Sequence, residues 1–217
     1  MNFLFFYLWP LLNIIFSMVY KPPTSMTANK PKIIRNFLSG VNVCSISLLG
    51  ILYYLTNYKF LFDLSIIIPQ TYYIWDSFFI ILHKKKNELG YVYHHLVCMI
   101  LLEQTTSSSL TAGYVYAALV VGELSNCGII PVYHLTKTLD LADIEDKKRL
   151  HYWKKIQLCW YGFFRIPVLG VIFFKAFETL SYFYYIPYIS IYVMGVVWSK
   201  KQFDKYVNDE KELLKEE

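Results

Sequence analysis

Two adjacent histidines, His94 and His95, stand just inside an apolar run, in the stretch YVYHHLVCM at residues 91–99. Histidine titrates near neutral pH, which makes it the natural general base, and it can also accept an acyl group as a nucleophile. Adjacent residues of a helix point about 100° apart, so at most one of the two rings aims directly at a cavity. We therefore expect one histidine to act and the other to support it.

Further polar side chains interrupt other apolar segments of the chain: Asp76, Glu123, Asn126 and Arg165. Charged groups at bilayer depth are costly and usually face a bundle interior or a wet cavity. Glu123 and Asn126 are three residues apart, so they share one face of a helix. Two structural alternatives stay open: Asp76 and Arg165 form an ion pair with each other, or Glu123 is a protonated packing residue.

The composition identifies the environment of these side chains as a bilayer. Of the 217 residues, 56% are hydrophobic and 17% are charged, and a soluble domain of this size cannot bury so much apolar surface. The apolar residues occur in blocks of about twenty, the length of a membrane-spanning helix. The blocks predict seven spans, at roughly 2–20, 37–55, 65–82, 92–110, 111–133, 158–175 and 180–198.

The basic residues support this partition and predict its orientation. Of the 21 Lys and Arg residues, all except Lys59, Arg165 and Lys175 lie in alternate segments between the spans or in the tail, and Arg35 is counted among them. Because cytoplasmic loops collect Lys and Arg, the N-terminus is expected to be lumenal and the C-terminus cytoplasmic. The net charge of +5 is thus assigned to the membrane surface. Nucleic-acid binding is not expected, because no compact basic domain is present.

The prediction for the fold is an all-α, polytopic membrane protein with about seven transmembrane helices around a central cavity that faces the cytosol. By the rise of a helix, the polar residues lie in the cytoplasmic half of their spans or near the midplane. The segment 134–157 is either a solvated loop or an interfacial helix. The end of the chain is either a short charged helix or a disordered tail. The cysteines follow no ligand spacing, so neither a disulfide nor a metal site is expected.

The run from residue 91 to residue 135 resembles the centre of the TLC-domain family. That family includes ceramide synthases, the TRAM translocation-associated proteins and a group of lipid-regulating membrane proteins. Its members carry a His-His pair at the start of one span, which His94 and His95 match. The resemblance implies a TLC-like transmembrane domain at 30–205, after a first transmembrane helix and linker at 1–29 and before a charged cytoplasmic tail at 206–217.

Two further motifs carry the resemblance. ELSN at 123–126 is similar to the acidic motif on the family's next span. Glu123 and Ser125 carry over, whereas Asn126 stands where ceramide synthases have an acid. YIWDSFF, at 73–79, resembles a Tyr- and Asp-containing span and places Asp76 near the same centre. The second motif is closer to the family members that are not ceramide synthases.

The resemblance implies three alternative functions. The first is an acyl-CoA-dependent lipid acyltransferase resembling ceramide synthase, of the endoplasmic reticulum, with acyl-CoA as substrate and no cofactor. The second is a non-catalytic, lipid-binding regulator of membrane composition, and the third is a TRAM-like translocation or cargo factor. Membrane lipids are the expected partners, and a homo-oligomer stays open. In the first alternative, the catalytic residues are His94, His95, Glu123 and Asp76, and the substrate-binding residues are Arg165, Asn126 and Ser125.

Overall fold

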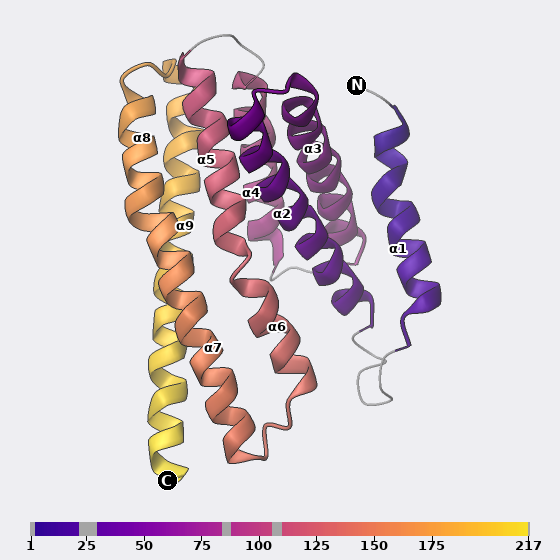
Figure 1. The fold of residues 1–217 in the computed structure, drawn as a ribbon, viewed down its shortest axis with the longest axis vertical. Coiled ribbons are helices and arrows are strands. Elements are labelled where there is room, and N and C mark those ends of the chain that lie inside the picture. Colours follow the sequence, from indigo (N-terminus) through magenta and orange to yellow (C-terminus); the bar gives the residue numbers. More distant parts are fainter. Residues whose placement is uncertain (1–2, 22–29, 84–87, 106–109, 217) are drawn as a thin grey trace. The chain divides into compact units, whose positions relative to one another are not determined.

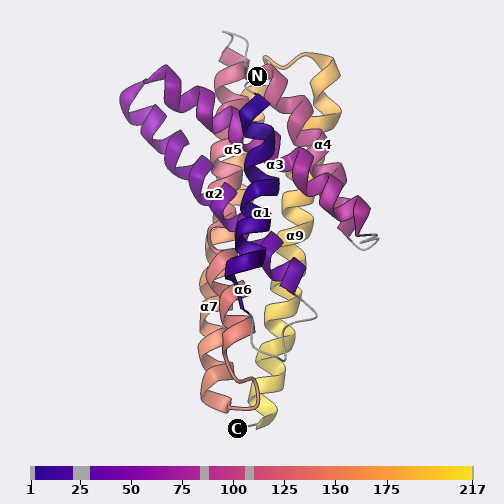
Figure 2. The ribbon, with the colours of Figure 1, turned by 90° about the vertical axis from the view of Figure 1, so that its right-hand side faces the viewer.

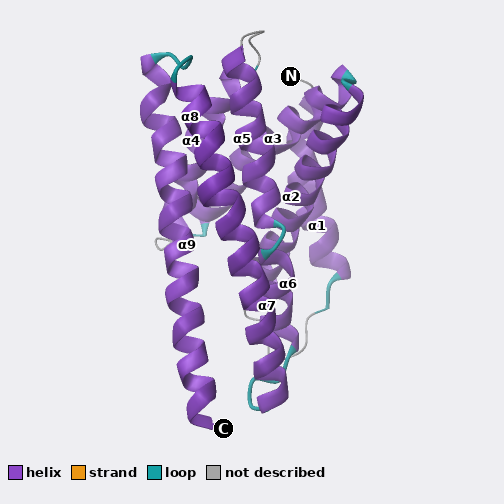
Figure 3. Cartoon of the chain, turned by 60° about the vertical axis from the view of Figure 1, so that its left-hand side comes forward, coloured by secondary structure: helices purple, strands orange, loops and turns teal. Residues whose placement is uncertain are grey.

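A computed structural model describes residues 3–21, 30–83, 88–105 and 110–216 of the chain (Figure 1). Every regular element in those ranges is a helix, as the single colour of the elements in Figure 3 shows. The all-α prediction is therefore confirmed. The helices form two compact units, Met1–Thr106 and Ser107–Glu217.

The first unit is built on a hairpin of two long helices. Its described elements are η1 (Phe3–Tyr7), α1 (Leu8–Val19), α2 (Lys30–Thr56), α3 (Lys59–Leu82) and α4 (Leu89–Gln104). Asn57 ends α2 with a φ of 55°, the left-handed conformation in which helices often stop. The chain then turns at once into α3, which packs on α2 on one side and on α4 on another. The hairpin thereby brings side chains of α2, α3 and α4 together.

The first helix is fixed to α3 by a buried tryptophan. The Trp9 indole Nε1 donates a hydrogen bond to Thr71 Oγ1 over 3.1 Å, and its ring meets the edge of Tyr72 at a centroid distance of 5.0 Å. Trp9 is 1% exposed. Since a buried indole N–H usually finds an acceptor, this contact fixes the depth of α1 against α3.

The second unit consists of longer rods. Its described elements are α5 (Leu110–Asn126), α6 (Ile129–Thr138), α7 (Ile144–Phe163), the π-helical turn η4 (Phe164–Val168), α8 (Leu169–Phe177) and α9 (Tyr182–Glu216). The helix α7 begins at an N-cap, where the Asp143 carboxylate accepts a hydrogen bond from the Glu145 backbone N–H at 3.2 Å. Such a cap satisfies one of the free N–H groups of the first turn.

The charged ends of α7 and α9 lie side by side, as Figures 1 and 2 show. Lys154 Nζ and Asp209 Oδ2 are 2.6 Å apart, and the His151 ring stacks on Tyr206 at a centroid distance of 4.3 Å. Both segments whose structure the sequence left open are helical. Residues 144–157 belong to α7, and α9 continues as one helix through the predicted tail to Glu216. An interfacial position of residues 144–157 stays a prediction.

Four helical stretches among the described residues are long and apolar enough to cross a membrane. They are Lys30–Thr56, Lys59–Leu82, Leu110–Thr138 and Ile144–Phe177. The membrane character of the chain is thus supported, whereas the count of seven is not confirmed. The predicted span at 2–20 corresponds to a shorter apolar helix, Phe5–Val19, and those at 92–110 and 180–198 correspond to α4 and α9, which are not among the four.

Candidate functional site

The predicted site residues fall into two clusters, one in each unit. Asp76, His94 and His95 belong to the first unit. Glu123, Ser125, Asn126 and Arg165 belong to the second. In each unit the polar side chains surround a buried arginine, and the two arginines have different partners. A common cavity for all seven residues stays a prediction.

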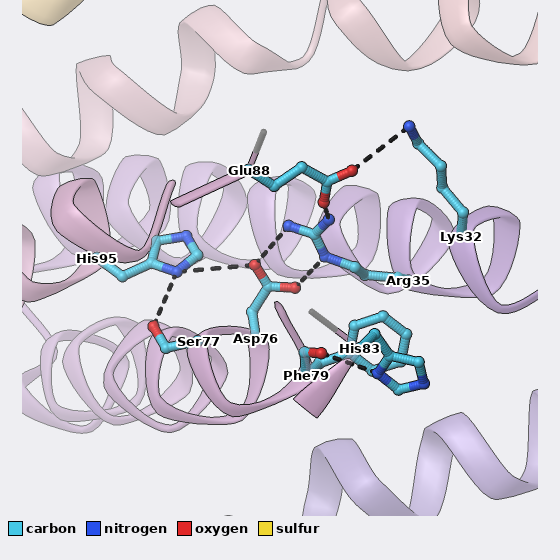
Figure 4. A network of polar contacts seen from close by, with 8 residues as sticks. All are labelled: Lys32, Arg35, Asp76, Ser77, Phe79, His83, Glu88 and His95. Atoms are coloured by element: carbon cyan, nitrogen blue, oxygen red, sulfur yellow. Dashed lines mark hydrogen bonds and ion pairs between the residues drawn. The ribbon is translucent and has the colours of Figure 1, made fainter. Parts of the chain in front are cut away.

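In the first unit, Arg35 of α2 forms a two-point ion pair with Asp76 of α3 (Figure 4). Arg35 Nε lies 2.5 Å from Asp76 Oδ1, and Nη2 lies 2.8 Å from Oδ2. Asp76 is 1% exposed and Arg35 is 8% exposed. Parallel N–H···O bonds between a guanidinium and a carboxylate are strong and directional, so this pair fixes the position of both Asp76 oxygens.

Two further charges extend the ion pair toward the start of α4. Arg35 Nη1 donates to Glu88 Oε2, and Lys32 Nζ lies 3.4 Å from Glu88 Oε1. The Glu88 side chain is 15% exposed and that of Lys32 is 49% exposed. The cluster therefore runs from a fully buried carboxylate at Asp76 to a solvated ammonium at Lys32.

His95 is the histidine that joins this cluster. Its Nδ1 lies 3.7 Å from Asp76 Oδ2 and 3.4 Å from Ser77 Oγ. The first distance is too long for a hydrogen bond, so the contact between ring and carboxylate is electrostatic. The Tyr73 ring stacks on the imidazole at a centroid distance of 4.9 Å. The ring is thus oriented on one edge by polar atoms and on one face by an aromatic side chain.

The other nitrogen of His95, Nε2, is not in contact with Asp76 or Ser77. In Figure 4 it carries no dashed line and lies on the edge of the ring away from Ser77. Within the described ranges, the structure gives Nε2 no hydrogen-bond partner. Because Ser77 and Asp76 both approach Nδ1, the three residues do not form a relay through both nitrogens. They orient the ring through one nitrogen only.

His94 takes a different direction, as the 100° separation of helical neighbours predicts. Its ring nitrogens lie 3.7 and 3.9 Å from Cys98 Sγ, one turn further along α4. The two imidazole centroids are 5.7 Å apart. The contacts of His94 with Cys98 thus differ from those of His95 with Asp76 and Ser77.

The sequence did not predict that Arg35 is the ion-pair partner of Asp76. One alternative paired Asp76 with Arg165, and the structure corrects it, because Asp76 pairs with Arg35. Arg35 was counted in the segment between the first two predicted spans, whereas it lies on the buried face of α2. A helical pattern does point to the buried face of α2. Its buried positions include Ile34, Arg35, Leu38, Asn42 and Ile46, a spacing of three to four residues that places Arg35 on that face.

In the second unit, Arg165 of η4 binds three neutral oxygens of α5. Nε donates to Ser125 Oγ at 2.7 Å, and Nη2 donates to the Gly122 carbonyl at 3.0 Å and to Asn126 Oδ1 at 3.2 Å. The guanidinium carbon lies 5.2 Å from the centroid of the Tyr161 ring. Arg165 is 3% exposed. Its guanidinium is therefore buried between neutral polar groups of α5 and the ring of Tyr161.

The local backbone explains why Arg165 faces inward. The turn η4 contains Pro167, which has no N–H to donate to the helical ladder, and single π turns of this kind are common at functional sites. The aliphatic part of Arg165 packs closely against Gly195 of α9. A Cβ at position 195 would lie 3.3 Å from Arg165 Cδ, so a glycine leaves room for the arginine side chain.

Glu123 and Asn126 share one face of α5, which confirms the expectation from their spacing. Asn126 Nδ2 donates to Glu123 Oε2 at 3.1 Å. The Asn126 amide therefore bridges the carboxylate of Glu123 and the guanidinium of Arg165. Ser125, which is fully buried, accepts from Arg165 and donates to the Gly122 carbonyl at 2.5 Å.

Among the described residues, no group of three or more His, Cys, Asp and Glu side chains is placed to hold a metal ion. Comparison of the chain with protein-family models, with curated proteins and with solved structures gives no match in any of the three. The support for any function therefore comes from the sequence and from the two clusters.

Proposed function

We propose that the chain is a multi-pass membrane protein of lipid metabolism that transfers an acyl group from acyl-CoA to a lipid amine or hydroxyl. The proposal includes seven spans, a lumenal N-terminus, a cytoplasmic C-terminus and residence in the endoplasmic reticulum. It is supported by the apolar helices, by the buried clusters, and by the resemblance of residues 91–135 to the TLC-domain family.

The observation that carries the proposal is the orientation of His95. Its Nδ1 faces Asp76 and Ser77, and its Nε2 has no partner among the described side chains. A proton on Nδ1 leaves the lone pair of Nε2 to act as a base. General bases need this arrangement, with one nitrogen held by a polar group and the other within reach of the acceptor.

In the proposed reaction, His95 Nε2 takes the proton of the acceptor N–H or O–H as the acceptor attacks the thioester carbonyl. The bond from the acceptor to the acyl carbon forms and the carbon–sulfur bond breaks. The proton then passes from Nε2 to the departing CoA thiolate. Asp76 stabilises the transient positive charge on the ring, and Arg35 holds Asp76 in place. The role of orienting the imidazole falls to Asp76, since Glu123 interacts with Asn126.

The cluster in the second unit supplies the proposed substrate contacts. Arg165 attracts an anionic or carbonyl oxygen, and Ser125 and Asn126 keep its guanidinium in position. Glu123 has a hydrogen-bonded carboxylate that can accept a polar hydrogen from the acceptor lipid.

A second function, non-catalytic lipid binding, is favoured by one observation. Both Asp76 oxygens are occupied by Arg35, and an ion pair of this kind stabilises a fold whether or not the protein turns over a substrate. In this alternative His95 holds the head group of a bound lipid. The third alternative, a translocation factor, predicts stable partner proteins in mild detergent and no dependence on the histidines.

The decisive experiment is acyl transfer by the purified full chain, using labelled acyl-CoA and a panel of sphingoid bases and other lipid acceptors. His95→Gln is expected to lower the rate by about 10²–10⁴-fold, the usual contribution of a general base. His134→Gln is the matched control, because His134 is exposed and lies outside both clusters. Equal activity of the two variants would remove the catalytic proposal.

A second experiment separates the alternatives in cells. Lipid profiles of cells that express the wild-type chain are compared with those of a His94→Ala, His95→Ala double variant. A lipid class that rises only with the wild-type chain supports transfer. Copurified lipid with no turnover on any acyl donor supports the lipid-binding alternative, and stable protein partners that survive both substitutions support the third.

A further inference from the structure

A groove on one face of α7 remains outside both polar clusters. Tyr152, Lys155, Ile156, Cys159 and Trp160 line it, and it is an open, shallow hollow of about 380 Å³. These positions are spaced three, four, seven and eight residues apart, so they form a single helical face. All five side chains are exposed.

The groove lies where α7 changes character. Residues 144–155 carry seven charged side chains, whereas residues 156–177 carry only Arg165, which is buried, and Lys175 near the far end. Lys155 is therefore the last exposed charge before the apolar part of Ile144–Phe177, the helical stretch that is long and apolar enough to cross a membrane. Since charged groups are costly within a bilayer, this change of composition marks the membrane surface.

The walls of the groove suit that position. Tyr152 and Trp160 are residue types that gather at membrane–water interfaces. Trp160 is held in place, because its Nε1 donates to the Leu124 carbonyl at 2.9 Å. The ring also lies against the backbone near Gly128, where a Cβ would come within 3.1 Å of Trp160 Cδ1. One wall is thus a fixed aromatic surface.

The chemistry changes along the groove from polar to apolar. Lys155 provides a positive charge one turn beyond Tyr152, and Ile156, Cys159 and Trp160 continue from it toward the apolar part of the helix. Phe163, which is 58% exposed, follows on the same face one turn beyond Cys159 and Trp160. A ligand that matches this order has an anionic head and an apolar tail.

We propose that this groove binds one anionic glycerophospholipid of the surrounding bilayer. The lipid phosphate lies against the Lys155 ammonium, and one acyl chain lies along Ile156, Trp160 and Phe163. Lysine stems pack on apolar surface while the ammonium reaches the interface, and a basic residue near the surface attracts anionic lipids. This proposal depends on membrane insertion and is independent of acyl transfer.

Native mass spectrometry of the full chain in detergent tests the proposal, with dioleoyl phosphatidylglycerol and dioleoyl phosphatidylcholine as the two probes. We expect the wild-type chain to prefer the anionic lipid. Lys155→Gln is expected to lower affinity for that lipid about fivefold, the size of one interfacial charge contact, with little change for phosphatidylcholine. Lys155→Arg, which keeps the charge, is expected to retain the preference.

Two further variants make the test specific to the groove. Lys201→Gln removes the same charge at an exposed position of α9 outside the groove, and less than a twofold change is expected. Cys159→Phe fills the groove and is expected to weaken binding of both lipids. Equal losses in the Lys155 and Lys201 variants, equal affinity of the wild-type chain for the two lipids, or full binding by Cys159→Phe would each overturn the proposal.

Discussion

Arg35 and Arg165 are both buried arginines on helices that are apolar enough to span a membrane, yet their charges are stabilised differently. Arg35 is bound by carboxylates, with both Asp76 oxygens and one Glu88 oxygen as acceptors. Every acceptor that the structure gives Arg165 is a neutral oxygen, from a serine, an amide side chain and a backbone carbonyl.

The difference indicates different roles. An ion pair with two parallel hydrogen bonds fixes geometry and cancels charge, which suits a cluster that must hold the His95 ring. A guanidinium held by dipoles is positioned but keeps its positive charge, which suits recognition of a polar substrate group. In our proposal, Arg35 therefore fixes the geometry around His95, and Arg165 is suited to attract a polar group.

The largest expected effect comes from removing the charge in the first unit. Arg35→Met leaves the Asp76 carboxylate buried without its partner and is expected to lower the free energy of unfolding by about 3–5 kcal/mol. The measurement is denaturant or thermal unfolding of the full chain in mild detergent. The double variant Arg35→Met, Asp76→Leu is expected to recover most of the loss, because it removes both charges. Failure of this recovery would contradict the ion pair.

An intermediate effect is expected from the matching substitution in the second unit. Arg165→Met removes the hydrogen bonds that the guanidinium donates. The acceptors are neutral oxygens, so no carboxylate loses its partner, and Ser125 keeps its hydrogen bond to the Gly122 carbonyl. We expect a loss of about 1–3 kcal/mol in the same unfolding measurement. A loss greater than that of Arg35→Met would reverse the proposed distinction between the two arginines.

The smallest effect is expected at the outer edge of the first cluster. Glu88 is partly exposed and contacts Arg35 and Lys32, so Glu88→Gln is expected to cost about 0.5–1 kcal/mol, as for other ion pairs near solvent. The loss should shrink further in high salt, which screens exposed charges. A loss as large as that of Arg35→Met would show that Glu88, and not Asp76, is the main counter-charge.

Sequence reasoning succeeded where the signal was local. The helical class follows from the apolar blocks, the divergence of His94 and His95 from the helical repeat, and the pairing of Glu123 with Asn126 from their spacing. Each of these depends on residues within one helix. The association of Asp76 with the His95 region was also anticipated, through the resemblance of its motif.

The partners from other helices were not predictable in the same way. Arg35 lies 41 residues before Asp76, and nothing in its neighbourhood distinguishes it from the lysines of a cytoplasmic segment except the helical spacing of Ile34 and Leu38. For a related reason, the sequence did not decide whether the charged segments now seen in α7 and α9 are helical. Their charged ends are stabilised by contacts with each other, such as Lys154 with Asp209, and such contacts are invisible in either segment alone.

The most direct test of the central claim is the tautomer of His95, measured by nitrogen NMR on the full chain labelled at histidine. The His95 signals are assigned by their loss in His95→Gln. We expect the proton on Nδ1, facing Asp76 and Ser77, with Nε2 unprotonated, and we expect Asp76→Asn to shift this balance. A His95 ring protonated on Nε2, or a spectrum unchanged by Asp76→Asn, would contradict the account of His95 as a base oriented by the first cluster.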